Sequence, residues 1–64
     1  MGNIAENIIR RRTAAGLTQM QLADKVGVAQ SMICQIERGT KVPTIPLGKQ
    51  IAKALKCKID DLAE

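Results

Sequence analysis

The segment from Thr18 to Gly39 constrains the fold of this chain more than any other, because it carries the start and stop signals of two short helices. Thr18 can cap a helix through its hydroxyl, and Gln21, three residues later, completes a capping box. Gly27 can adopt the left-handed conformation that ends a helix without a steric penalty at Cβ. The pattern therefore predicts a helix of about two turns from Gln19, followed by a tight turn and a second helix.

The second predicted helix, residues 30–38, has two unlike faces. A rotation of about 100° per residue places Met32, Ile33 and Ile36 on one arc, which we expect to face the core. The opposite arc has no acidic side chain, and it carries Gln30, Ser31, Cys34, Gln35 and Arg38. Amides, a hydroxyl and a guanidinium can pair with base edges and phosphates in the major groove of DNA. A short polar helix held by its apolar back on a preceding helix is the helix-turn-helix arrangement.

Further residues extend this pattern over most of the chain. In order, they are Gly16-Leu17-Thr18-Gln19, Leu22-Ala23, Gly27-Val28, Ile33, Ile36-Glu37-Arg38-Gly39, Pro43, Ile51-Ala52, Ala54-Leu55 and Asp60-Asp61-Leu62. From about residue 8 to residue 62, the chain resembles the Cro/C1-type (XRE, lambda repressor-like) helix-turn-helix family of phage and bacterial transcriptional regulators. The resemblance implies an all-α fold, a compact bundle of five short helices. We expect a single domain over residues 1–64, with the helix-turn-helix at residues 19–38.

A first helix is predicted ahead of the motif, with Asn3 as its N-cap. Its apolar side carries Ile4, Ala5, Ile8, Ile9 and Ala15. Arg12 projects from the middle of that side, where an unpaired charge would be strongly destabilising. Glu37, at the edge of the apolar face of the second motif helix, is the best candidate partner, and residues at these two positions form an ion pair in the resembled family. The alternative is a solvated Arg12 whose side chain reaches the surface.

Two short helices are predicted after the motif. Thr44 is the expected N-cap of a helix that runs to about Leu55, and Gly48 in its interior weakens that helix by about 1 kcal/mol relative to alanine. Its expected buried residues are Ile45, Leu47, Ile51, Ala54 and Leu55. Residues 59–63 should form a fifth short helix or turn, with Leu62 pointing inward.

The composition argues against several other classes of function. The chain has no Phe, Tyr or Trp, so it offers no aromatic ring on which unpaired bases could stack, and single-stranded nucleic acid is a disfavoured ligand. Because it also lacks histidine, no nucleophile has a recognisable base, and we do not expect an enzyme. The net charge of +4 suits a polyanionic partner but is also ordinary for solubility.

Cysteine usage and the absence of long apolar runs predict a cytoplasmic protein without a metal centre. Cys34 and Cys57 lack the spacing of metal ligands, so neither a metal nor another cofactor is expected. Both should be free thiols, with Cys57 acting as a small apolar residue. Redox sensing by Cys34 is a less favoured alternative. No stretch approaches the roughly 20 apolar residues of a membrane span, and polar residues interrupt the start of the chain where a signal peptide would be apolar.

The resemblance also assigns DNA contacts to individual residues. Gln30, Ser31 and Gln35 match positions from which lambdoid repressors read bases. Cys34 lies between them and could make a weaker base contact. A glutamine such as Gln30 can bond N6 and N7 of adenine together, a contact worth about 1–3 kcal/mol of discrimination. Phosphate contacts are expected from Thr18, Gln19, Arg38, Thr40 and Lys41.

The predicted function is sequence-specific binding of double-stranded DNA by a transcriptional regulator, a repressor that acts as a homodimer on a palindromic operator. By resemblance, the dimer would form through the C-terminal region, where Ile59 and Leu62 are either exposed or part of the core. An alternative is a protein-binding module, such as an antitoxin or coactivator-like component, built on the same fold. For Gln30 and its neighbours the alternative is an ordinary exposed helix face. Ala29 departs from the family, which usually has a capping Ser or Thr there, and Gln19 could also brace Gln30.

Overall fold

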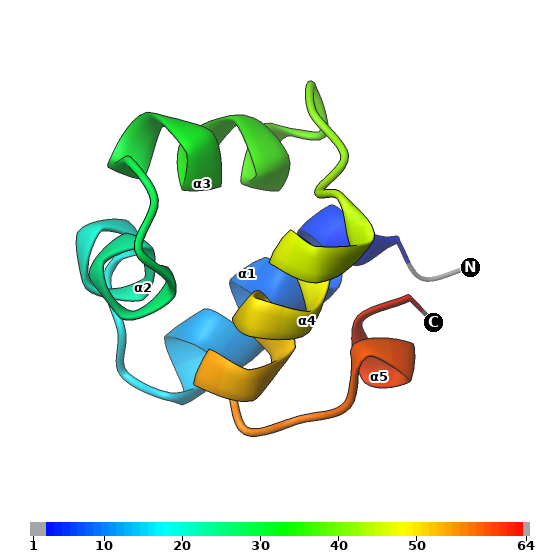
Figure 1. Ribbon diagram of the computed structural model, residues 1–64. Helices are drawn as coiled ribbons and strands as arrows, with labels where there is room; N and C mark the ends of the chain where they lie inside the picture. Colours follow the sequence, from blue (N-terminus) through cyan, green and yellow to red (C-terminus); the bar gives the residue numbers. More distant parts are fainter. Residues whose placement is uncertain (1–2, 64) are drawn as a thin grey trace.

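The computed structural model describes residues 3–63, and five helices form an all-α bundle in this part of the chain (Figure 1). They are α1 (Ile4–Ala14), α2 (Gln19–Val26), α3 (Gln30–Arg38), α4 (Ile45–Ala54) and α5 (Ile59–Ala63). The predicted fold class is therefore confirmed, and α2 and α3 have the boundaries predicted for the helix-turn-helix. Among residues 3–63, no helix has both the length and the apolar character of a membrane span.

Local signals set the boundaries of α2. The backbone N–H of Gln21 donates to Thr18 Oγ1 at 3.0 Å, and the backbone N–H of Thr18 donates to Gln21 Oε1 at 2.9 Å, which completes the capping box. Gly27 ends the helix in the left-handed conformation with φ 80°, and its N–H donates to Ala23 O at 2.8 Å. By contrast, the N-cap of α3, Ala29, makes no side-chain hydrogen bond. The start of α3 therefore depends more on packing than on capping.

The core is aliphatic and draws on all five helices. Its buried hydrophobic residues are Ile8, Leu22, Ala23, Ile33, Ile36, Ile51, Ala52, Leu55 and Leu62. Burial of each large aliphatic side chain contributes about 1.5–3 kcal/mol relative to exposure. Helix α1 packs against α3 and α5, whereas α2 packs against α3 and α4. The two helices of the motif thus contact both the preceding helix α1 and the following helix α4.

The expectation that Ile45 is buried is wrong, and so is the placement of Ala15 on the apolar side of the first helix. Ile45 is 69% exposed in the first turn of α4, and the first buried position of that helix, Gly48, comes one turn later. Ala15 is exposed because α1 ends before it and Ala15 forms the C-cap. Helical periodicity gives the direction of a side chain around the helix, but it does not reveal whether a neighbouring element lies at that height along the axis.

Helix α5 is held against both α1 and α4. The buried Asn7 of α1 donates from Nδ2 to the backbone oxygen of Leu62 at 2.8 Å. The Leu62 side chain is fully buried, which confirms its predicted inward orientation. A Cβ atom at Gly48 would lie 3.2 Å from Cδ1 of Ile59, so the glycine allows α5 to approach α4 closely. The helix-weakening Gly48 therefore has a packing role.

Candidate nucleic-acid interface

Helix α3 lies along one edge of the molecule, next to the loop that precedes α4 (Figure 1). Its inner side is anchored by Ile33 and Ile36, whose exposed fractions are both 0%. On the outer side Gln30, Ser31 and Gln35 are exposed, and Cys34 is half-buried. The structure thus brings the four predicted base-reading residues together on one face of α3, with Cys34 the least accessible of them.

The start of α2, whose first residue Gln19 contacts Glu37 of α3, presents backbone donors. Thr18 and Gln21 satisfy each other in the capping box. Within residues 3–63, this leaves the N–H groups of Gln19 and Met20 without a protein acceptor. The first turn of α2 has no acidic residue, and the positive end of the helix dipole favours an anion there. The Thr18 hydroxyl accepts one hydrogen bond and retains its proton for donation. This helix start can therefore bind a phosphate oxygen.

The end of α3 carries the charged candidates. Arg38 and Lys41 are both exposed. Thr40, also exposed, donates its hydroxyl to the backbone oxygen of Gln35 at 3.1 Å, and its N–H donates to the same oxygen at 3.1 Å. The hydroxyl proton of Thr40 is therefore used to close the end of α3, whereas Arg38 and Lys41 remain available to a polyanion.

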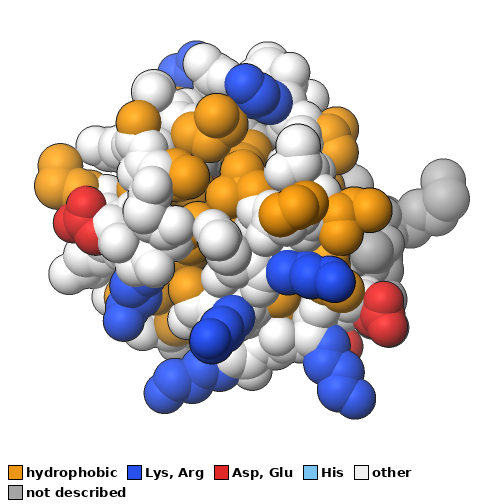
Figure 2. Space-filling model, viewed as in Figure 1, with side chains coloured by type: hydrophobic (Ala, Val, Ile, Leu, Met, Phe, Trp, Pro, Cys, Tyr) orange, Lys and Arg blue, Asp and Glu red, His pale blue; other side chains and the backbone are white. Residues whose placement is uncertain are grey.

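Positive charge is not confined to α3. On the face drawn in Figure 2, Lys and Arg side chains are spread over the lower part and also occur at the top, whereas acidic side chains lie toward the two sides. The chain as a whole carries ten basic and six acidic residues. This distribution attracts a polyanion without marking one binding face. The chemistry of the α3 face, and not the net charge, distinguishes the candidate site.

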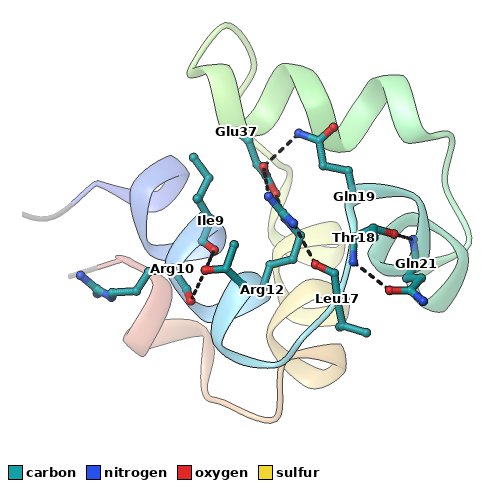
Figure 3. A network of polar contacts seen from close by, with 9 residues as sticks. Ile9, Arg10, Arg12, Leu17, Thr18, Gln19, Gln21 and Glu37 are labelled. Atoms are coloured by element: carbon teal, nitrogen blue, oxygen red, sulfur yellow. Dashed lines mark hydrogen bonds and ion pairs between the residues drawn. The ribbon is translucent and has the colours of Figure 1, made fainter.

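Arg12 and Glu37 form the centre of a polar network behind α3 (Figure 3). Arg12 Nε donates to Glu37 Oε2 at 2.7 Å and Arg12 Nη2 donates to Oε1 at 3.1 Å. Arg12 Nη1 also donates to the backbone oxygen of Leu17 at 2.8 Å. The two side chains are only 14% and 5% exposed, so Arg12 is not the solvated residue of the alternative interpretation. Two parallel bonds of this kind are stronger and more directional than a single contact.

Gln19 joins the same network, which the sequence interpretation missed. Its Nε2 donates to Glu37 Oε1 at 3.0 Å, so the side chain is directed to the carboxylate of α3 (Figure 3). The suggested brace between Gln19 and Gln30 is not the contact found. No spacing rule links these positions, because the side chains meet only once α2 and α3 cross. Asn7, which sits among the apolar positions of α1, is also buried, although its residue type did not predict this.

The two cysteines are free thiols in different surroundings. Cys57 packs against the hydrophobic core between α4 and α5. Burial raises the pKa of the Cys57 thiol above its ordinary value; the Arg11 guanidinium opposes this increase, and the Asp61 carboxylate adds to it. A thiol with a raised pKa stays protonated at neutral pH and behaves as a small apolar side chain.

A model of the protein family described as "Helix-turn-helix" matches residues 8–62. The chain belongs to the Cro/C1-type helix-turn-helix family. An uncharacterized HTH-type transcriptional regulator of Archaeoglobus fulgidus is 39% identical over 51 residues, which are 80% of this chain and 73% of that protein. The cryptic phage CTXphi transcriptional repressor RstR of Vibrio cholerae is 36% identical over 59 residues, 92% of this chain. The chain covers only 53% of the length of RstR.

A solved structure supports the same assignment. The P22 c2 repressor, crystallised in complex with the synthetic operator 9T, superposes with a TM-score of 0.94. The sequences are 31% identical, and the alignment covers 100% of this chain and 97% of that one. The similarity therefore extends over the whole bundle and includes α4 and α5 as well as the helix-turn-helix.

Proposed function

We propose that this member of the family is a sequence-specific regulator of transcription, a repressor that binds double-stranded DNA with α3 in the major groove. The observation that carries the proposal is the outer face of α3, which is polar and free of acidic side chains, while Ile33 and Ile36 on its inner face are fully buried. A helix anchored in this way can present amide groups to base edges in a fixed geometry. The similarity to the P22 c2 repressor, which was solved with an operator, supports DNA as the ligand.

Base readout in this proposal comes from Gln30, Ser31 and Gln35, which are exposed on that face. Cys34 is half-buried and contributes at most an apolar contact with a thymine methyl group. We assign the phosphate contacts of α2 to the unpaired N–H groups of Gln19 and Met20 and to the hydroxyl of Thr18. These contacts position the helix without reading the sequence.

At the other end of α3, Arg38 and Lys41 supply the charged phosphate contacts. Thr40 supports them indirectly, because its hydroxyl closes the end of the helix on Gln35. Each cation that neutralises a phosphate releases a counterion, so binding should weaken as the salt concentration rises. Because the proposed target is duplex DNA, the protein would act in the cytoplasm.

Useful specificity requires more base contacts than one small module offers, so we propose a homodimer on a palindrome. Two half-sites about one helical turn apart match a two-fold symmetric protein. We propose that the copies meet through the C-terminal region, on the exposed side of α5 that carries Asp60, next to the exposed Lys58. Leu62 is fully buried in the single chain, so it would not contribute to this contact.

Selection of bound duplexes from a random-sequence pool tests the proposed function. The selection is run at two salt concentrations, because non-specific electrostatic binding weakens more steeply with salt than binding that also includes base contacts. We expect a palindrome to be enriched, with half-sites spaced by about one turn. Binding that weakens equally for all sequences, without an enriched site, would reject sequence-specific regulation.

A further inference from the structure

The carboxylate of Glu37 joins three helices (Figure 3). It belongs to α3, receives two hydrogen bonds from Arg12 of α1 and receives one from Gln19 of α2. With a side chain only 5% exposed, Glu37 is shielded from solvent. In the described residues, the side-chain hydrogen bonds that connect α3 to other helices converge on this one group.

The hydrogen bonds to Glu37 determine the placement of α3, because the other restraints on this helix are weakly directional. Ile33 and Ile36 anchor the helix through apolar packing, which is proportional to buried area and does not favour one direction. The N-cap Ala29 makes no side-chain hydrogen bond. The rotation and height of α3 are therefore set most sharply by the hydrogen bonds to Glu37, which lose strength quickly outside a narrow range of distance and angle.

Gln19 and Arg12 make different kinds of hydrogen bond to the Glu37 carboxylate. Arg12 already offers the Glu37 carboxylate a bidentate partner of opposite charge. The neutral amide of Gln19 is not needed to compensate the charge, and its bond at 3.0 Å adds mainly a directional restraint. Gln19 is also the first residue of α2, where its backbone N–H is free for a phosphate. One residue thus connects the phosphate-binding start of α2 with the base-reading helix.

We infer that Gln19 is a positioning residue for sequence recognition, whose side chain sets the placement of α3 through Glu37 and does not itself contact DNA. This inference rests on the proposed function. Bidentate contacts from a glutamine to adenine need both bonds within hydrogen-bond distance, so a small displacement of α3 is enough to lose them. Contacts to phosphates tolerate such a displacement better, because much of their energy is electrostatic and depends weakly on geometry.

The variant Gln19→Met separates the two roles. Methionine has a similar length and keeps the backbone N–H, but it has no donor for Glu37. The affinity is measured for the palindrome enriched from the random pool and for an unrelated duplex of the same length, at one salt concentration. We expect affinity for the palindrome to fall about a hundredfold, because one good base contact, worth about a factor of ten, is lost in each half-site, while affinity for the unrelated duplex changes less than about twofold.

Two further variants complete the design. Gln50→Met changes an exposed glutamine of α4, and it should leave both affinities as they are in the natural chain. Gln19→Lys restores a donor toward Glu37, so we expect the ratio of the two affinities to return toward that of the natural chain. Thermal unfolding of every variant identifies a temperature at which all of them are folded, and the affinities are measured there. If Gln19→Met folds poorly, the two affinities of Gln19→Lys are compared with those of the natural chain instead.

The outcomes distinguish this inference from the proposed function. An equal loss of affinity for both duplexes in Gln19→Met would identify a direct phosphate contact and overturn the positioning role. No change on either duplex would overturn it as well. If the natural chain itself bound the two duplexes equally, sequence-specific recognition would be rejected, and the positioning role with it.

Discussion

Arg12 in α1 and Glu37 in α3 are 25 residues apart in sequence, yet Arg12 Nε and Glu37 Oε2 lie 2.7 Å apart. The pair joins the first helix to the helix that carries the candidate base-reading residues. The Arg12 guanidinium also bonds the backbone oxygen of Leu17, which lies in the turn before α2. The Arg12 side chain of α1 therefore restrains both the turn that leads into α2 and helix α3.

Arg12→Ala should destabilise the protein substantially. The substitution leaves the nearly buried Glu37 carboxylate without its charged partner, and breaking such a pair from one side costs about 3–5 kcal/mol. We expect the lower end of this range, because Gln19 still donates to the carboxylate. In a protein of this size each kcal/mol lowers the melting temperature by about 4–8 °C. Thermal unfolding followed by circular dichroism measures the change.

Arg38→Ala is the matched control, since Arg38 is exposed and carries the same charge. Its free energy of unfolding should stay within about 0.5 kcal/mol of that of the natural chain, so its melting temperature should change little. Replacing both Arg12 and Glu37 by methionine should recover most of the loss, because no unpaired charge remains. Equal melting temperatures for Arg12→Ala and Arg38→Ala would refute a structural role for the pair.

Ala29→Ser should stabilise α3. Ala29 already has the extended backbone of an N-cap, with φ −70° and ψ 149°, but its side chain makes no capping bond. A serine hydroxyl could accept from a free N–H of the first turn, and a good cap is worth about 0.5–2 kcal/mol relative to alanine. Chemical denaturation of the two chains gives the difference in unfolding free energy.

Thr18→Ala provides the reverse comparison, because it removes a cap that the structure contains. We expect a loss of similar size, about 1 kcal/mol. A destabilising Ala29→Ser would mean that packing at the start of α3 leaves no room for the hydroxyl to reach an N–H group.

The stability contributed by Cys57 should fall at alkaline pH. Burial raises the pKa of the thiol in the folded protein, although Arg11 partly opposes the increase. The folded state therefore holds this proton more tightly than the unfolded state, so the contribution is complete below the thiol pKa of the unfolded chain. It is lost as the pH rises through the higher pKa of the folded protein. Unfolding curves across the alkaline range measure the effect.

Cys57→Val removes this titration, and its stability should decline less over the same pH range. Cys34→Ala retains Cys57 and should keep the decline of the natural chain. In Cys34→Ala, alkylation of the remaining thiol should also be slower in the folded state than in denaturant, because thiolate is the reactive form. Equal pH dependence in Cys57→Val and the natural chain would contradict the assigned cause.

Local signals made much of this fold predictable. The capping box at Thr18 and the left-handed Gly27 involve residues within a few positions of each other, so the sequence spacing alone predicts them. Because an unpaired charge on the apolar side of a helix is strongly destabilising, the sequence predicts an acidic partner for Arg12, and Arg12 pairs with Glu37. Each of these inferences needed only local geometry or one strong energetic constraint.

The remaining features depend on how the helices meet. Ile45 has the apolar character of a core residue, yet no neighbour covers the first turn of α4 enough to bury it. Asn7 can be buried because its side-chain amide donates to the backbone oxygen of Leu62 in α5. Gln19 contacts Glu37 only because α2 and α3 cross there. Such contacts are set by tertiary packing, which neither helical periodicity nor residue type specifies.

The most direct test of the central claim, that the outer face of α3 reads bases, is a substitution scan of the selected palindrome. Affinities of the natural chain and of Gln30→Ala are measured for duplexes changed at one symmetric position at a time. We predict that Gln30→Ala loses about 1–3 kcal/mol in each half-site, about 2–6 kcal/mol on the whole palindrome, and becomes indifferent to the base at one position of each half-site. If Gln30→Ala binds the palindrome as well as the natural chain and keeps its full base preference, the claim is contradicted.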